Sequence, residues 1–318
     1  MTSLHALDQR LLDQRLTGGI SPVLSVRARY NTSIMARFMD TSDPDNLTFV
    51  SRDVKGRPIK NGQYWDADLQ SYMYLQDFLS KSPNWKDIVN NIDKGLLPQY
   101  MDKEQLNTQI RKILDLAPER EERFMEIIDQ DDADGAASYW LGMLKISPAR
   151  HPATYLMVRV GRRIGEHVVM CLKGYFGSPR PSQLCPAIMP MIDPPATPSF
   201  PAGHAVQAYL ISYLLAYSLP RIPQQDLRNE KGPLFDLAFR VSENRVVAGL
   251  HYPTDIAVGR EVGLRCFMQL LDVPSVWGDK NSPSGEYRDA VDHTLTEDGS
   301  LEKKSLRARV QEEFPQYA

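Results

Sequence analysis

The sequence predicts an all-α fold, a helical bundle that carries its chemistry on the loops at one end. Two observations predict it. From Asp66 onward, apolar residues recur at helical spacing in one segment after another, whereas the alternating pattern of β-strands is sparse. In segment 152–173, apolar residues recur every four positions and form one stripe along a helix. Such stripes are buried when helices pack against one another.

The first 65 residues are expected to form an N-terminal extension that is partly helical. Leucines at helical spacing begin at Leu7, and Gly18 and Gly19 stop that helix. Residues 40–64 are rich in Asp, Asn, Ser, Pro and Gly, a composition typical of a loop.

Residues 66–275 are expected to form the helical-bundle catalytic domain. Helices are predicted at 66–80, 84–92, 103–116, 119–130, 135–145, 152–173, 203–219, 224–248 and 253–271. A proline-rich loop over 177–202 interrupts the series. Residues 276–318 are expected to be a polar C-terminal tail on the surface, with one helix at 299–313.

The composition favours a soluble globular protein and excludes several classes. Hydrophobic residues make up 42% of the 318 residues and charged residues 24%, which is ordinary for a chain with a full core. The net charge of −3 gives no basic field for nucleic acid. The three cysteines form no CxxC pair, so neither a disulfide framework nor a zinc site is expected.

Localisation is expected to be cytoplasmic. The chain does not open on a basic segment followed by an apolar one, as a secretory signal would. The longest apolar run, 205–219, is too short to span a bilayer and is interrupted by Gln207, Ser212 and Ser218. We therefore expect no membrane span.

The first motif that carries chemistry pairs Lys173 with Arg180. Lys173 closes a predicted helix, and Arg180 lies in a loop made rigid by Pro179 and Pro181. A guanidinium fork and an ammonium that converge suit a tetrahedral oxyanion. Taken alone, the motif is also compatible with two solvated surface cations.

The second motif places His204 at the start of an apolar helix, directly after Gly203. A helix N-terminus offers backbone N–H groups to an anion, and a histidine there can donate a proton to a leaving oxygen. A histidine that merely packs or caps would give the same pattern.

The third motif joins Arg245, His251 and Asp255. Pro253 suits the first turn of a helix, which would bring Asp255 close to His251. A carboxylate on one imidazole nitrogen fixes the tautomer and leaves the other nitrogen as a nucleophile. The alternative is a surface arginine and an aspartate that only favours the helix start.

Together the three motifs resemble the type 2 phosphatidic acid phosphatase (PAP2) superfamily over residues 150–272. That superfamily includes bacterial class A acid phosphatases, lipid phosphatases and vanadium-dependent haloperoxidases. Its signature is Lys-x6-Arg-Pro, Pro-Ser-Gly-His and Ser-Arg-x5-His-x3-Asp. The sequence has Lys173-x6-Arg180-Pro181, Pro201-Ala202-Gly203-His204 and Asn244-Arg245-x5-His251-x3-Asp255.

The sequence departs from this signature at two positions. Ala202 stands where the family has a serine, which removes a hydroxyl that would bind the oxyanion. Asn244 replaces the serine before Arg245, and its amide can still form hydrogen bonds.

The resemblance implies a role for each motif residue. His251 would attack phosphorus and form a phosphohistidine, or would coordinate vanadate. His204 would protonate the leaving group and then activate water, and Asp255 would orient His251. The groups that would bind phosphate or vanadate are Lys173, Arg180, Gly203, His204 and Arg245. As a phosphatase the enzyme would need neither a metal nor a cofactor; as a haloperoxidase it would need vanadate.

Three functions stay open at this stage. The first is a soluble phosphohydrolase that cleaves phosphate monoesters, with a small phosphorylated molecule as substrate. The second is a vanadium-dependent haloperoxidase, with halide, peroxide and an organic substrate. The third is a non-catalytic descendant that binds phosphate, which Ala202 keeps open. We expect no nucleic-acid partner and no membrane span. The sequence is compatible with a homo-oligomer.

Overall fold

The computed structural model describes residues 66–81, 85–90, 92–98, 102–131, 135–219, 230–278, 294–295, 301–302 and 304–315. The chain divides into two compact units, Met1–Lys60 and Asn61–Ala318, and every described residue lies in the second. The helix and loop predicted within residues 1–65 therefore lie outside the described residues.

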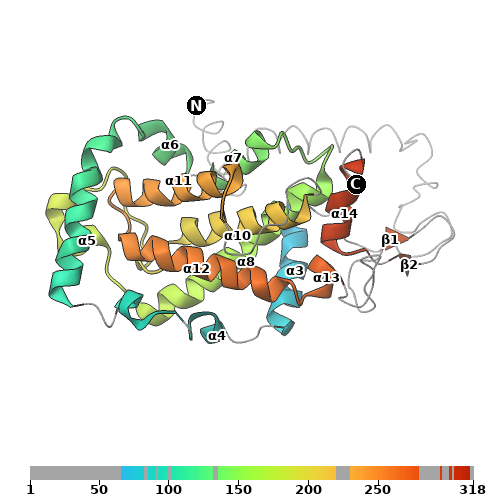
Figure 1. Ribbon diagram of the computed structural model, residues 1–318, viewed down its shortest axis with the longest axis horizontal. Coiled ribbons are helices and arrows are strands. Elements are labelled where there is room, and N and C mark those ends of the chain that lie inside the picture. The colour runs from blue at the N-terminus through green and yellow to red at the C-terminus, as the bar shows by residue number, and fades with distance from the viewer. Residues whose placement is uncertain are drawn as a thin grey trace, which may run out of the picture. The chain divides into compact units, whose positions relative to one another are not determined.

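The described residues confirm the all-α prediction (Figure 1). The first half of the unit contains α3 (Ala67–Lys81), α4 (Lys86–Val89), η2 (Lys94–Leu96), α5 (Lys103–Leu116), η4 (Ala117–Arg120), α6 (Phe124–Asp129) and α7 (Gly135–Met143). The second half contains α8 (Pro152–Phe176), α9 (Pro181–Leu184), η5 (Pro186–Ile188), α10 (Gly203–Ser218), α11 (Pro233–Val247), α12 (Pro253–Leu270), α13 (Pro274–Trp277) and α14 (Leu306–Glu312). A two-residue strand, β1 (Thr294–Leu295), pairs antiparallel with β2 (Leu301–Glu302).

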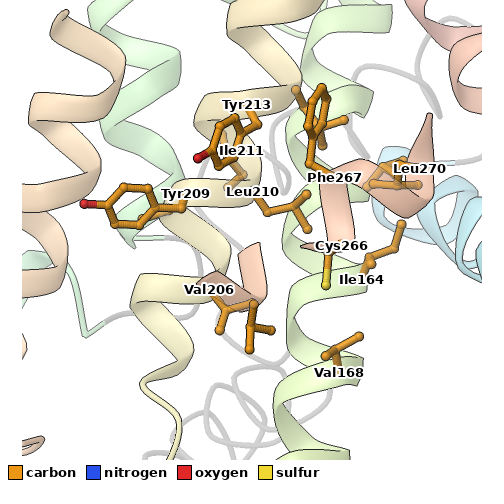
Figure 2. Close-up of a cluster of buried hydrophobic side chains, with 14 of the residues drawn as sticks. Ile164, Val168, Val206, Tyr209, Leu210, Ile211, Tyr213, Cys266, Phe267 and Leu270 are labelled. Carbon is orange, nitrogen blue, oxygen red and sulfur yellow. The ribbon is translucent and has the colours of Figure 1, made fainter. Parts of the chain in front are cut away.

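Helix α10 is the centre of the bundle. It packs against α8, α11 and α12, and nearly all its side chains are buried because its sequence is apolar on every face. Figure 2 shows Leu210 and Tyr213 of α10 in a cluster with Ile164 of α8 and Phe267 of α12. Among the described residues, no helix combines the length and apolarity needed to cross a membrane.

Two predicted boundaries are wrong for physical reasons. The helix predicted at 224–248 does not include residues 230–232, because α11 begins at Pro233 after Gly232 in a positive-φ conformation. The predicted loop 177–202 contains two short helices, α9 and η5, each of which begins at a proline.

The expected surface tail is also wrong where α14 is concerned. Leu306 and Val310 of this helix are fully buried, and α14 packs against α8. The carboxylate of Glu313 accepts hydrogen bonds from the backbone N–H groups of Ala153 (2.5 Å) and Thr154 (3.0 Å). These groups open α8 and have no partner within the helix, so Glu313 caps α8 from the C-terminal segment.

Glycines let α12 approach α10 closely. A Cβ atom added at Gly263 would lie 2.9 Å from the carbonyl oxygen of Val206 and 3.1 Å from the Cβ of Tyr209. A backbone carbonyl cannot rotate away as a side chain can, so a larger residue would push the two helices apart.

We predict that Gly263→Ala lowers the free energy of unfolding by about 1–3 kcal/mol, because overpacking outweighs the better helix propensity of alanine. The matched control is Gly142→Ala in α7, where no atom lies within 4 Å of an added Cβ. That variant should be unchanged or more stable by up to about 1 kcal/mol. Urea denaturation followed by circular dichroism measures both. Equal effects would contradict the close-approach argument.

Candidate functional site

The residues of the three sequence motifs lie at helix ends or in the turns beside them, with His251 in the turn between α11 and α12. Lys173 is in the last turn of α8, and Arg245 is in the last turn of α11. His204 is in the first turn of α10, Asp255 is in the first turn of α12, and Arg180 directly precedes α9. Successive helices of the bundle run in opposite directions, so these ends meet.

The third motif forms a histidine–carboxylate pair that is almost completely buried. The Nδ1 atom of His251 lies 3.1 Å from Oδ2 of Asp255. On the other side of the ring, Nη1 of Arg180 lies 3.0 Å from Nε2 of His251. A guanidinium can only donate, so Nε2 carries the lone pair and Nδ1 carries the proton. The nitrogen that faces Arg180 is therefore the nucleophilic one.

Ser199 completes this pair, although sequence reasoning assigned it no role. Its hydroxyl donates to Oδ2 of Asp255 at 2.5 Å and lies 3.4 Å from Nδ1 of His251. Oδ2 also accepts the backbone N–H of Tyr252 at 3.0 Å. Three donors thus converge on one carboxylate oxygen and hold Asp255 against His251.

Lys173 and Arg180 are buried and held by backbone carbonyls. The ammonium of Lys173 donates to the carbonyls of Pro198 and Ser199. The guanidinium of Arg180 donates through Nε to the carbonyl of Thr197 (3.0 Å) and through Nη1 to that of Leu250 (2.9 Å). These bonds draw the 197–199 segment and the loop before α12 together around the two cations.

Arg245 has no exposed surface, yet its guanidinium is only partly bonded. Its Nη2 donates to the carbonyl of Ile127 (2.9 Å) and to Oε1 of Gln130 (3.2 Å), and Nη1 forms an ion pair with Asp131 at 3.5 Å. Its Nε and Nη1 have no hydrogen-bond acceptor among the described residues. A buried cation with free donors suits an anionic ligand.

His204 is turned toward Gln130. Its Nε2 lies 2.7 Å from the backbone carbonyl oxygen of Gln130, which can only accept. Nε2 therefore carries the proton of the neutral ring, and Nδ1 keeps the lone pair. A cavity of about 150 Å³ adjoins His204 and is also lined by Trp140, Gln207 and Gln130.

Burial and mutual repulsion shift the pKa values of the site. Burial, together with Arg180, lowers the pKa of Lys173 to about 7. Burial raises the pKa of Asp255 to about 6, although the bonds from Ser199 and Tyr252 oppose the rise. Burial and then Arg245 lower the pKa of His204 to about 3. For His251, burial and then Arg180 hold the pKa well below its usual value, so its ring is neutral at pH 7.

The departure at Ala202 lies at the start of α10. Ala202 is fully buried and occupies the N-cap position, where its side chain caps no backbone N–H. Gly203 follows as the first helical residue and is partly buried. The first N–H groups of α10 therefore depend on other partners, which an oxyanion can provide.

The departure at Asn244 has a structural explanation. Its Nδ2 donates to Glu126 (3.0 Å) and Gln130 (3.1 Å), while its Oδ1 accepts from Arg123 (3.2 Å). Asn244 thus ties α11 to the segment around α6. Neither this role nor that of Gln130 follows from local spacing, because the contacts join segments more than 100 residues apart.

The comparisons with known proteins agree with this geometry. No curated protein matches the chain. Residues 155–274 match the family described as the PAP2 superfamily, and this segment contains all three motifs. Over this segment the chain is therefore similar to the PAP2 superfamily.

Proposed function

We propose that this protein is a phosphohydrolase that cleaves phosphate monoesters through a phosphohistidine on His251. The observation that carries the proposal is the neutral, buried ring of His251. Asp255 holds its Nδ1, and its Nε2 faces Arg180. Burial, followed by the charges of Arg180 and the other two cations, lowers the pKa of the ring. A nucleophile set among cations is what transfer of a dianionic phosphoryl group requires.

In the first step, the lone pair on Nε2 of His251 attacks phosphorus, and the bond from phosphorus to the leaving oxygen breaks. The leaving oxygen takes a proton from Nδ1 of His204. In the second step, water attacks the phosphohistidine, His204 takes a proton from that water, and the P–N electron pair returns to Nε2. Asp255 keeps the proton of His251 on Nδ1 throughout.

The acid role of His204 depends on the substrate. In the free site the ring is neutral, because burial and the charge of Arg245 disfavour a second proton. A phosphate dianion offsets that positive charge and raises the proton affinity of Nδ1. We infer that His204 takes up its proton together with the substrate.

The same donors fit vanadate, which is also a tetrahedral oxyanion. Bound vanadate would supply the peroxide activation of a haloperoxidase, with His251 as its ligand. Phosphatase and haloperoxidase activity must therefore be distinguished by assay.

The first test uses one metal-stripped preparation in two assays. We expect release of phosphate from p-nitrophenyl phosphate and inhibition of that release by vanadate. His251→Ala should lower kcat by at least about a thousandfold, because the nucleophile is lost. In the second assay the protein receives vanadate, peroxide, bromide and a halogen-trapping dye. Vanadate-dependent bromination with negligible phosphate release would support the haloperoxidase instead, and neither activity would support a phosphate-binding protein.

We predict that kcat/KM is highest between about pH 6 and pH 7. Asp255, with its pKa raised to about 6, is a carboxylate above that pH, so activity should rise through pH 6. Lys173, with its pKa lowered to about 7, is charged below that pH, so activity should fall as pH rises through 7. Stopped assays in one buffer series of constant ionic strength would measure both limbs. A flat profile from pH 5 to pH 9 would contradict these assignments.

Ala202→Ser is predicted to leave activity unchanged or to raise it. A serine at this N-cap position can accept a backbone N–H of α10 and donate its hydroxyl proton to a bound oxyanion. We expect vanadate to inhibit at lower concentration and the melting temperature to stay equal or rise. A large loss of activity would mean that the local packing requires alanine.

A further inference from the structure

Gln130 lies outside the three motifs and contacts three of their members, His204, Arg245 and Asn244. It follows α6 directly, and only 1% of its surface is exposed. Its backbone carbonyl binds Nε2 of His204 at 2.7 Å, and its side-chain Oε1 accepts from Nη2 of Arg245 at 3.2 Å. One residue therefore fixes both the candidate acid and a candidate oxyanion ligand.

The contact with Arg245 decides which of its donors stay free. Gln130 and the carbonyl of Ile127 are the two hydrogen-bond acceptors of Nη2, and a guanidinium nitrogen of this kind has two protons. Nε and Nη1 are left without acceptors among the described residues. Two neutral oxygens thus hold Nη2, whereas Nε has no acceptor among the described residues and Nη1 has only the ion pair with Asp131 at 3.5 Å.

The contact with His204 fixes the proton on the ring. Because a carbonyl oxygen can only accept, it holds a proton on Nε2 and leaves Nδ1 for the exchange with substrate and water. Backbone carbonyls often fix the tautomer of a functional histidine in this way, by accepting the proton of one ring nitrogen.

Asn244 holds Gln130 in place. Its amide has two protons, which reach Oε1 of Gln130 and Oε2 of Glu126. A serine, with one hydroxyl proton, could not donate to both. The position of Gln130 therefore depends on the asparagine that stands at position 244.

We propose that Gln130 is a positioning residue of the active site, which orients Arg245 and selects the tautomer of His204, and that Asn244 secures it. The effect expected on turnover rests on the proposed phosphohydrolase function. The orientation itself does not, because oxyanion binding and the state of the His204 ring can be measured without turnover.

The principal test is Gln130→Ala. We expect the dissociation constant of inorganic phosphate or vanadate, measured by calorimetry, to rise roughly tenfold or more, since a bond to a buried charged group is lost. Without its side-chain bonds, residue 130 no longer holds its backbone carbonyl in place against His204. In ¹⁵N spectra of histidine-labelled protein, the His204 signal, assigned with His204→Ala, should therefore show a weaker preference for the Nε2–H tautomer. In turnover, KM should rise and the pH profile of kcat should change.

Gln130→Glu is the conservative partner of that variant. It keeps an oxygen acceptor for Arg245 and Asn244, so the tautomer of His204 should be retained. Its negative charge should compete with the oxyanion for Arg245, so phosphate binding should still weaken. A residue with only a structural role would not separate these two readouts.

Arg240→Ala is the matched control. It removes an ion pair to Glu126 on the same α6 segment, and both side chains are 38% exposed. Such a pair contributes little, so phosphate binding should stay within about twofold of the original. Equal losses in Arg240→Ala and Gln130→Ala would show that any loosening of α6 has the same effect and would overturn the proposal.

Asn244→Ser keeps the test decisive should Gln130→Ala not fold. It leaves Gln130 in the chain and removes one of its donors, so both readouts should move in the same direction by a smaller amount. An unchanged His204 signal and unchanged phosphate binding in folded variants would overturn the proposal. By contrast, a fixed His204 tautomer in a protein that turns over no phosphate ester would contradict the proposed function alone.

Discussion

The structure of the site depends on the burial of three cations, Lys173, Arg180 and Arg245, which are accompanied by the carboxylates of Asp255 and Asp131. Buried charge is strongly unfavourable unless it is bonded, and here backbone carbonyls from several loops supply most of the bonds. The hydrogen bonds between the cations and these carbonyls therefore fix the loops as well as the cations. Burial, followed by the charges of these cations, lowers the pKa of both histidines, and Nε of Arg245 has no hydrogen-bond acceptor among the described residues. An oxyanion is the ligand that would complete this balance.

The bundle keeps these charges in place because its helices cannot slide. Glycines bring α12 against the backbone of α10, and Glu313 fixes the first turn of α8. These contacts anchor three helices that carry site residues, α8, α10 and α12. The segment around α6 is joined differently, through polar contacts with Asn244 and Arg245. The site thus lies between the tightly packed helices of the bundle and the segment around α6, which is held by hydrogen bonds.

Most helices of the bundle and the three motifs can be recognised from the sequence, because both depend on the spacing of residues that are close in the chain. Helices such as α8 show their apolar stripe within a few turns, and His251 and Asp255 are one helical turn apart. The role of Ser199 does not follow from the sequence, since its partner Asp255 is 56 residues away. Gln130 and Asn244 were missed as site residues for the same reason. The polar composition of the C-terminal tail concealed two buried residues of α14, because seven residues of helix bury only one narrow face.

The cap that Glu313 places on α8 has a consequence for biosynthesis. Chains emerge from the ribosome from the N-terminus onward, and elements pack as their partners become available. Residues 153 and 154 are synthesised long before residue 313, so the first turn of α8 stays uncapped while the rest of the bundle appears. Since α8 also carries Lys173, the helix that holds the first motif is capped by a segment that emerges after the rest of the bundle. The first turn of α8 is therefore capped only once this segment has been translated.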